Sequence, residues 1–122
     1  MTTTAQKKRA LGAYGEAVAA RHLEAAGMAV LDRNWRCDEG ELDLVLREGH
    51  VLVVCEVKTR SSDACGTPHQ AVDDAKLDRL QRLARRWLHA HEVRCDDVRV
   101  DLVAVVPQRR GAALVDHVRG IG

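Results

Sequence analysis

Apolar residues recur at helical spacing in two parts of the chain. Over residues 10–28 they return every three or four positions, and Gly27 stands where a helix would end. A second apolar stripe with the same spacing covers residues 69–91, directly after Pro68. The pattern therefore predicts two amphipathic helices, one near the start of the chain and a long one in its second half.

Shorter apolar or alternating segments bounded by turn residues predict strands. The dipeptide Glu48-Gly49 is typical of a two-residue hairpin turn, because glycine adopts positive φ angles without strain. Residues 60–68 are rich in Ser, Asp, Gly and Pro and predict an exposed loop. The predicted strands cover residues 28–37, 41–47, 50–59, 98–106 and 112–118.

The order of these elements predicts an α/β fold, α-β-β-β-α-β(-β), with a mixed sheet flanked by the two helices. The helix between the third and fourth strands supplies the crossover that a parallel strand pair needs. A chain of 122 residues corresponds to one domain. We therefore expect a single domain over residues 1–122, with residues 1–9 as a flexible arm and residues 107–122 as a terminal hairpin strand and tail.

The hairpin around Glu48-Gly49 gathers charged residues at one end. With this turn, Arg47 lies opposite His50 and Glu41 lies opposite Glu56, and side chains alternate between the two faces. The first face is fully apolar and carries Leu42, Leu44, Leu46, Val51, Val53, Cys55 and Val57. The second face carries Val45, Leu52 and Val54, followed at the end away from the turn by Glu41, Asp43, Glu56 and Lys58.

Three carboxylates beside one ammonium group leave negative charge unbalanced, and like charges opposite one another destabilise a strand pair. A hard divalent cation such as Mg²⁺ or Mn²⁺, held by one or two carboxylates and by water, would offset this repulsion. Lys58, on the same face as Glu56, would then stabilise charge on a phosphate or help to deprotonate water. The set predicts metal-assisted phosphodiester hydrolysis. The alternative is a half-exposed face on which Lys58 pairs with one carboxylate.

Composition narrows the classes of protein and of partner. The net charge of +1 conceals a charged fraction of 30%, so a polyanion would have to be bound by local clusters of Lys and Arg. No run of about 18 apolar residues and no signal peptide is visible, and the four cysteines lack metal-binding spacing. We therefore expect a cytoplasmic protein with reduced thiols and no membrane contact. Its few aromatic residues do not suit serial stacking of single-stranded bases, which favours duplex or branched DNA.

Four sequence strings, in this order, resemble those of a known bacterial family. They lie within residues 14–106 and read YGEAVAARHLEAAGMAVLDRNWR, GELDLV, VVCEVKTR and DLVAVV. The strings resemble the YraN-like family, which is related to archaeal Holliday junction resolvases. The spacing of Asp43 and Glu56-x-Lys58 resembles the PD-(D/E)XK nuclease superfamily. The resemblance implies a restriction-endonuclease-like (Holliday junction resolvase-like) fold, a Mg²⁺-dependent DNA endonuclease and a homodimer.

Carried over residue by residue, the resemblance implies a role for each charged residue of the hairpin. It implies Asp43 and Glu56 as catalytic metal ligands and Lys58 as the catalytic lysine. Glu16 matches the acidic residue that completes the metal site in related resolvases, although an ordinary carboxylate at the edge of the helix is an equal alternative. Glu41 belongs to the family string but not to the superfamily triad, so we expect it beside the ligands or facing solvent.

Basic residues offer candidate contacts to a phosphate backbone. The predicted DNA-binding residues are Lys76, Arg79, Arg82, Arg36 and Arg60. The alternative is a solvated helix face whose basic residues pair with Asp73, Asp74 and Asp78. Two other functions also stay open: a catalytically silent DNA-binding scaffold, and a structural dimer that binds neither metal nor DNA.

Overall fold

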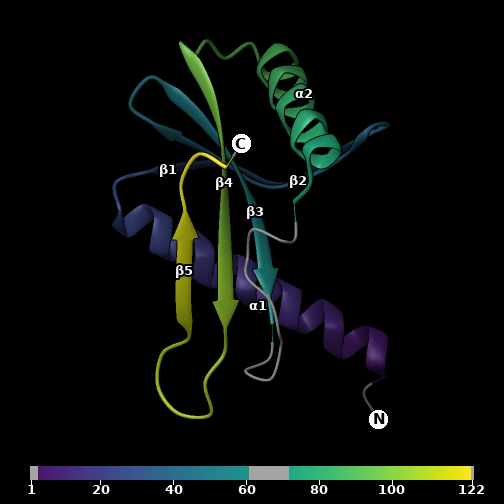
Figure 1. Cartoon of the computed structure of the whole chain (residues 1–122), viewed down its shortest axis with the longest axis vertical. Coiled ribbons are helices and arrows are strands. Elements are labelled where there is room, and N and C mark those ends of the chain that lie inside the picture. Colours follow the sequence, from purple (N-terminus) through teal and green to yellow (C-terminus); the bar gives the residue numbers. More distant parts are fainter. Residues whose placement is uncertain (1–2, 61–71, 122) are drawn as a thin grey trace.

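The computed structural model describes residues 3–60 and 72–121 of the chain. Its elements follow the order predicted from the sequence (Figure 1). They are α1 (Thr4–Ala25), β1 (Ala29–Cys37), β2 (Gly40–Glu48), β3 (Val51–Thr59), α2 (Asp74–His91), β4 (Asp97–Val106) and β5 (Leu114–Val118). The predicted mixed α/β architecture, including the short final strand, is therefore confirmed.

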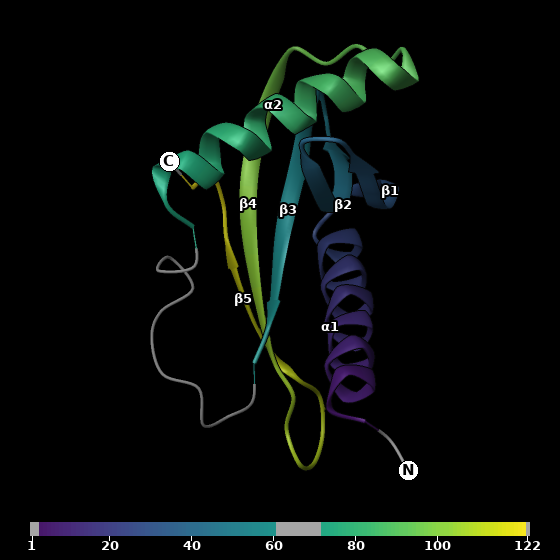
Figure 2. The same cartoon turned by 90° about the vertical axis from the view of Figure 1, so that its right-hand side faces the viewer.

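Within the described residues, five strands form one open sheet in the order β1-β2-β3-β4-β5. Of these strands, only β3 and β4 pair in parallel, and the other neighbours are antiparallel. α1 covers one face of the sheet and α2 covers the other, as Figures 1 and 2 show from two directions. The connection that contains α2 thus supplies the crossover between β3 and β4.

Two apolar clusters, one on each face of the sheet, hold the helices in place. The cluster under α1 contains Ala19, Ala20, Leu23, Met28, Leu44, Leu46, Val53, Cys55, Val103 and Val105. The cluster under α2 contains Leu42, Val45, Leu52, Val54, Leu80, Leu83, Ala84, Trp87 and Val100. Because both faces of the central strands are covered, β3 and β4 each contain an uninterrupted apolar run, residues 51–55 and 102–106.

α1 begins at Thr4, whereas the apolar pattern predicted a start at residue 10. Thr3 and Gln6 form a capping box: the Thr3 side chain accepts the Gln6 N–H at 3.1 Å, and Gln6 Oε1 accepts the Thr3 N–H at 2.8 Å. Residues 4–9, expected in a flexible arm, therefore belong to α1. The predicted end is confirmed, because Gly27 follows the helix with a φ of 100°.

α2 begins at Asp74, because the Asp73 side chain accepts the backbone N–H of Lys76 at 2.8 Å and caps the first turn. The predicted start at residue 69 is too early, since residues 72 and 73 are not helical; residues 69–71 lie outside the described part of the chain. Neither α1 nor α2, the helices of the described residues, is long and apolar enough to cross a membrane.

The hairpin between β2 and β3 turns at Gly49-His50, one residue later than predicted. Glu48 pairs with Val51, so the predicted pairing of Arg47 with His50 is wrong. Gly49 has a φ of 60°, which glycine adopts readily. The observed register differs from the predicted register by two residues. Two residues are one full period of a strand, so most side chains keep their predicted face.

β2 and β3 separate at the end of the hairpin away from the turn. Their pairing runs from Glu48 and Val51 to Leu44 and Cys55. Beyond this point, residues 40–42 of β2 pair with β1, while β3 continues its pairing with β4. The two strands thus form a fork, and Figure 1 shows β1 and β2 turning away from β3.

The fork changes two predicted positions. Leu42 packs in the cluster under α2, although strict alternation placed it with Leu44 under α1. Glu41 pairs with Arg36 of β1 and does not lie opposite Glu56. Both differences arise because alternation and register extend only as far as two strands stay paired.

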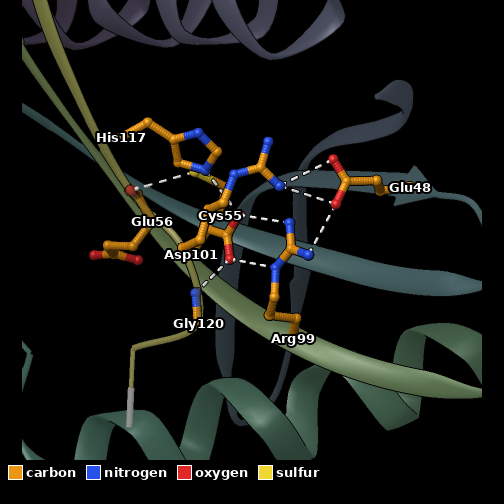
Figure 3. Close-up of polar contacts among 8 residues, drawn as sticks. Glu48, Cys55, Glu56, Arg99, Asp101, His117 and Gly120 are labelled. Carbon is orange, nitrogen blue, oxygen red and sulfur yellow. Dashed lines mark hydrogen bonds and ion pairs between the residues drawn. The ribbon is translucent and has the colours of Figure 1, made fainter. Parts of the chain in front are cut away.

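A buried network of ion pairs joins the C-terminal residues to the sheet (Figure 3). The Asp101 side chain is fully buried and accepts hydrogen bonds from Arg99 Nε at 2.8 Å, Arg99 Nη2 at 3.0 Å and the Gly120 N–H at 2.9 Å. His117 Nε2 lies 2.8 Å from the same carboxylate, and Arg99 Nη1 bonds Glu48 at 2.9 Å. A buried carboxylate needs such donors, so the network couples the packing of β4, β5 and the chain end.

The described cysteines are free thiols, as the sequence predicted. They are Cys37, Cys55 and Cys95, and Cys65 lies outside the described residues. Burial raises the pKa of the Cys55 thiol well above its ordinary value, and the charge of Asp101 adds to this effect. Cys55 is therefore a packing residue of the cluster under α1.

Candidate functional site

Asp43 and Glu56 lie at the fork, on the first residues beyond the last β2–β3 pair. The Asp43 side chain accepts the backbone N–H of Val57 at 2.9 Å, so it takes the place of the missing strand neighbour. Both carboxylates line the same two hollows. The structure thus brings together the two residues that the sequence predicted as a pair.

The two hollows open toward different helices. The first has a volume of about 490 Å³ and lies between α1 and the end of β3, where Lys8, Glu16 and Lys58 line it beside the carboxylate pair. The second has a volume of about 380 Å³ and lies between the start of β2 and α2. It is lined by Glu39, Gly40, Glu41, Asp43, Glu56, Lys76, Arg79 and Leu80.

Glu56 takes part in a double ion pair. Its Oε1 lies 2.6 Å from Lys76 Nζ and 3.5 Å from Lys58 Nζ. The Glu56 side chain is 11% exposed, so this charge is largely removed from solvent. Lys58 pairs with one carboxylate, as the alternative interpretation expected, and Lys76, one of the predicted DNA-binding residues, bonds the same oxygen.

Asp43 is in a different electrostatic environment. Burial and then the charge of Glu56 raise the pKa of Asp43 to about 7, although the hydrogen bond from Val57 opposes them. The charges of Glu16 and Glu41 make smaller contributions to the same rise in pKa. The repulsion between carboxylates that the sequence predicted therefore acts mainly on Asp43.

This pKa predicts that Asp43→Asn stabilises the metal-free protein at alkaline pH. A raised acid pKa means that the folded state resists ionisation, so wild-type stability falls as the pH rises from about 4 to 7 and then levels. The interval between 3.8 and about 7 corresponds to roughly 4 kcal/mol, and relaxation around the ionised group will reduce it. We expect about 1–3 kcal/mol of extra stability at pH 8, and little at pH 4, measured by urea denaturation in EDTA.

Glu24→Gln is the matched control, because Glu24 is an exposed carboxylate on α1. We expect this control to change stability by about 0.5 kcal/mol or less at either pH. An Asp43→Asn protein that is destabilised equally at pH 4 and pH 8 would contradict the assigned electrostatics.

The carboxylates at the fork fit a hard divalent cation that is held partly by water. Within residues 3–60 and 72–121, no three His, Cys, Asp or Glu side chains are grouped closely enough to hold a metal ion by themselves. The predicted set of Asp43, Glu56 and Glu16 is therefore not assembled as a three-ligand site, although Glu16 lines the same hollow. Mg²⁺ needs only one or two carboxylates, with water and substrate oxygens as its remaining ligands, so Asp43 and Glu56 suffice.

Only part of the predicted DNA-binding set lies beside the carboxylates. Lys76 and Arg79 line the second hollow beside the carboxylates. Arg36 Nε instead lies 3.0 Å from Glu41, and Arg82 Nε lies 3.5 Å from Glu39. The backbone N–H of Arg60 donates to the carbonyl oxygen of Val105 at 2.9 Å, which extends the end of β3 along β4.

The acidic partners of α2 differ from the predicted ones. Arg82 and Arg86 pair with Asp38 and Glu39, which lie between β1 and β2. Asp73, predicted as a partner on the helix face, instead caps the helix. The pairs tie α2 to the β1–β2 turn beside the second hollow.

Lys8 is a residue of the site that the sequence assigned to the amino-terminal arm, as a phosphate contact, and not to a helix. It lines the first hollow because α1 extends back to Thr4, and Lys8, Gly12 and Glu16 share one face of the helix at intervals of four residues. The capping-box pattern of Thr3 and Gln6 was the signal in the sequence that could have revealed this longer helix.

Gly15 allows α1 to approach β3 closely. A Cβ atom at position 15 would lie 1.6 Å from Thr59 Oγ1 and 2.8 Å from Thr59 Cβ. Gly15 is buried and directly precedes Glu16, so this contact determines how near Glu16 comes to the fork. The sequence does not distinguish Gly15 from Gly12, whose missing Cβ would meet open space.

Comparison with protein families identifies a match over most of the chain. The family described as "Uncharacterised protein family UPF0102" matches residues 15–105, from α1 to β4. The chain belongs to the UPF0102 family. This match confirms the resemblance to a YraN-like family, and the UPF0102 range contains Glu16, Asp43, Glu56 and Lys58.

Other UPF0102 proteins are similar over nearly their whole length. A UPF0102 protein of Nocardioides sp. is 64% identical over 115 residues, covering 94% of this chain and 93% of the relative. One from Beutenbergia cavernae is 59% identical over 115 residues, covering 94% and 98%. Among solved structures, Pyrococcus furiosus SfsA in complex with Ca²⁺ gives a TM-score of 0.36 at 14% identity, with 94% of this chain and 65% of that chain covered. This structural similarity is too weak to support a conclusion about fold or function.

Proposed function

We propose that this UPF0102 protein is a divalent-metal-dependent DNA endonuclease that hydrolyses phosphodiester bonds in duplex or branched DNA. The observation that carries the proposal is the fork between β2 and β3, where Asp43 meets Glu56 beside two lysines. The two carboxylates, of which Asp43 has its pKa raised by burial and by the charge of Glu56, favour Mg²⁺ or Mn²⁺ as the cofactor. The proposal is independent of the number of subunits, and a homodimer stays a prediction.

The topology supports a restriction-endonuclease-like fold in the PD-(D/E)XK superfamily. A helix precedes a hairpin that carries Asp43 on one strand and Glu56-x-Lys58 on the next. A crossover helix then leads to a strand parallel to β3, which is the order of elements that the sequence resemblance implies. We propose membership of that superfamily on the combination of topology and residue spacing.

The residues at the fork have separate tasks in this proposal. Asp43 and Glu56 would hold the cation, which when bound would supply a Lewis acid that offsets negative charge on a phosphodiester. Lys58 is 34% exposed and lies 3.5 Å from Glu56, so its ammonium can donate to a phosphate oxygen that enters the first hollow. Lys8 and Arg79 add positive charge at opposite sides of the carboxylate pair.

The test is nicking of plasmid and four-way-junction DNA with Mg²⁺ or Mn²⁺. We expect Asp43→Asn, Glu56→Gln and Lys58→Met each to lower the rate by about 10²–10³-fold, because the first two each remove a charged ligand of the cation and the third removes the ammonium group that faces the phosphate. Glu24→Gln, on the exposed side of α1, is the control and should cut like wild type. Circular dichroism and thermal melting of every variant separate loss of chemistry from loss of fold.

Three outcomes would contradict the proposed activity or its assignment to this site. Salt-dependent DNA binding without turnover under either metal would identify a DNA-binding scaffold. Absence of both metal binding and DNA binding at low salt would identify a structural protein. If the three site variants cut as fast as wild type, the cleavage would come from another site or a contaminant.

A further inference from the structure

We propose that Lys76 occupies the cation position at Glu56 in the metal-free protein, and that a divalent cation and the Lys76 ammonium compete for Glu56 Oε1. This inference rests on the proposed metal-dependent function and concerns how the same site is regulated. Metal entry would release Lys76 from the carboxylate. A phosphate group that attracts the released ammonium would therefore favour metal binding.

The contact between Lys76 and Glu56 has the geometry of a strong ion pair. The Nζ–Oε1 distance is 2.6 Å, at the short end for a charge-assisted hydrogen bond. The two side chains are 24% and 11% exposed, so water screens the pair only partly. Lys76 thus neutralises the charge of Glu56, and both residues line the second hollow.

Lys76 can leave Glu56 without disturbing the fold. The Lys76 backbone is held by the Asp73 cap at 2.8 Å, independently of its ammonium group. Its flexible four-carbon stem lines the second hollow, which has a volume of about 380 Å³. Lys58 lies two residues from Glu56 on the same strand and is already 3.5 Å from the shared oxygen.

A dication and two ammonium groups cannot share one carboxylate oxygen at low cost. Like charges a few ångströms apart repel strongly where solvent screening is weak. The nearest ammonium group must therefore withdraw when the dication arrives. The released Lys76 and Arg79, which line the same hollow, would then both be available to a phosphate group.

The first experiment measures Mg²⁺ affinity by calorimetry with no DNA present. We expect Lys76→Met to bind Mg²⁺ about tenfold more tightly than wild type, a difference of about 1.4 kcal/mol. Lys8→Met is the matched control, since Lys8 lines the first hollow with the same carboxylates but has no described bond to Glu56. The control reports the through-space effect of removing one charge, and thermal melting checks that both variants are folded.

The second experiment follows the Lys76 ammonium directly by ¹⁵N NMR of lysine side chains. A hydrogen-bonded ammonium exchanges slowly with water, and we expect its signal to disappear or move to the position of a free lysine when Mg²⁺ saturates the protein. An unchanged signal at saturation would overturn the inference. So would a Lys76→Met affinity no greater than that of Lys8→Met, or a lack of Mg²⁺ binding by both wild type and Lys76→Met.

The outcomes separate this inference from the proposed activity. Mg²⁺ binding with release of Lys76, but without cleavage of any DNA, would support the competition and overturn the nuclease. Mg²⁺ binding by Lys76→Met alone would show that the lysine blocks the site in wild type. Cleavage with an unchanged Lys76 signal would support the nuclease and overturn the competition.

Discussion

Replacing Arg99 with methionine is expected to lower the free energy of unfolding by about 3–5 kcal/mol, because the buried Asp101 loses its principal counter-ion. Arg99 donates two hydrogen bonds to Asp101 and one to Glu48. Methionine preserves most of the apolar contact of the arginine stem but has no donor. The measurement is denaturation with urea at pH 7, followed by circular dichroism.

Arg119→Met is the matched control for this prediction. Arg119 Nη1 bonds Glu48 at 3.0 Å, but its side chain is 48% exposed. An exposed ion pair contributes about 1 kcal/mol or less, so we expect the control to stay close to wild type. Equal losses in the two variants would show that the burial of Asp101 has no energetic importance.

The effect of Arg99→Met should also depend on pH. Burial alone would raise the pKa of Asp101, but hydrogen bonds from Arg99, Gly120 and His117 lower it below its ordinary value of 3.8. A lowered acid pKa contributes stability above the unfolded pKa, and this is lost as the pH falls through the folded pKa. The difference between wild type and variant should therefore be largest near neutrality and should shrink below about pH 4.

Gly15→Ala is expected to destabilise the protein by about 2–3 kcal/mol, since the added methyl group cannot fit against Thr59 without a shift of α1. The shift would move Glu16 away from the fork and widen the first hollow. Urea denaturation measures the loss, and amide NMR shifts along β3 report the displacement of the helix.

Gly12→Ala makes the same substitution one turn earlier on α1 and has the opposite expected sign. Its Cβ would meet open space, so the higher helix propensity of alanine should stabilise the protein by about 0.5–1 kcal/mol. Destabilisation by both substitutions would show that the helix, and not its contact with Thr59, is sensitive. A stabilised Gly15→Ala protein would contradict the close approach of α1 to β3.

The order and type of the elements followed from local patterns in the sequence. Apolar residues at helical spacing predicted α1 and α2, and the turn at Glu48-Gly49 was displaced by only one residue. The ends of the helices were less accurate because polar caps determine them. The start of α1 is set by the capping box of Thr3 and Gln6, and the start of α2 by the hydrogen bond from the Lys76 N–H to Asp73. The apolar stripe gives no information at these positions.

The membership of the candidate site was largely predictable, but its contacts were not. Side-chain alternation placed Asp43, Glu56 and Lys58 together because a strand has a period of two, and the register difference of two residues preserved it. The contacts depend on how separate elements pack. They are the contact of Lys76 on α2 with Glu56, the position of Glu16 and Lys8 on α1 beside the first hollow, and the pairing of Arg36 with Glu41.

The sequence by itself determined the elements, the parallel crossover and the crowding of carboxylates on one hairpin, because these depend on neighbours along one or two adjoining strands. Only the tertiary structure decided which charge each carboxylate meets. At the fork, burial raises the pKa of Asp43 to about 7, while the packing of α2 places Lys76 beside Glu56. Electrostatic environment depends on distances between groups remote in sequence, and packing alone sets those distances.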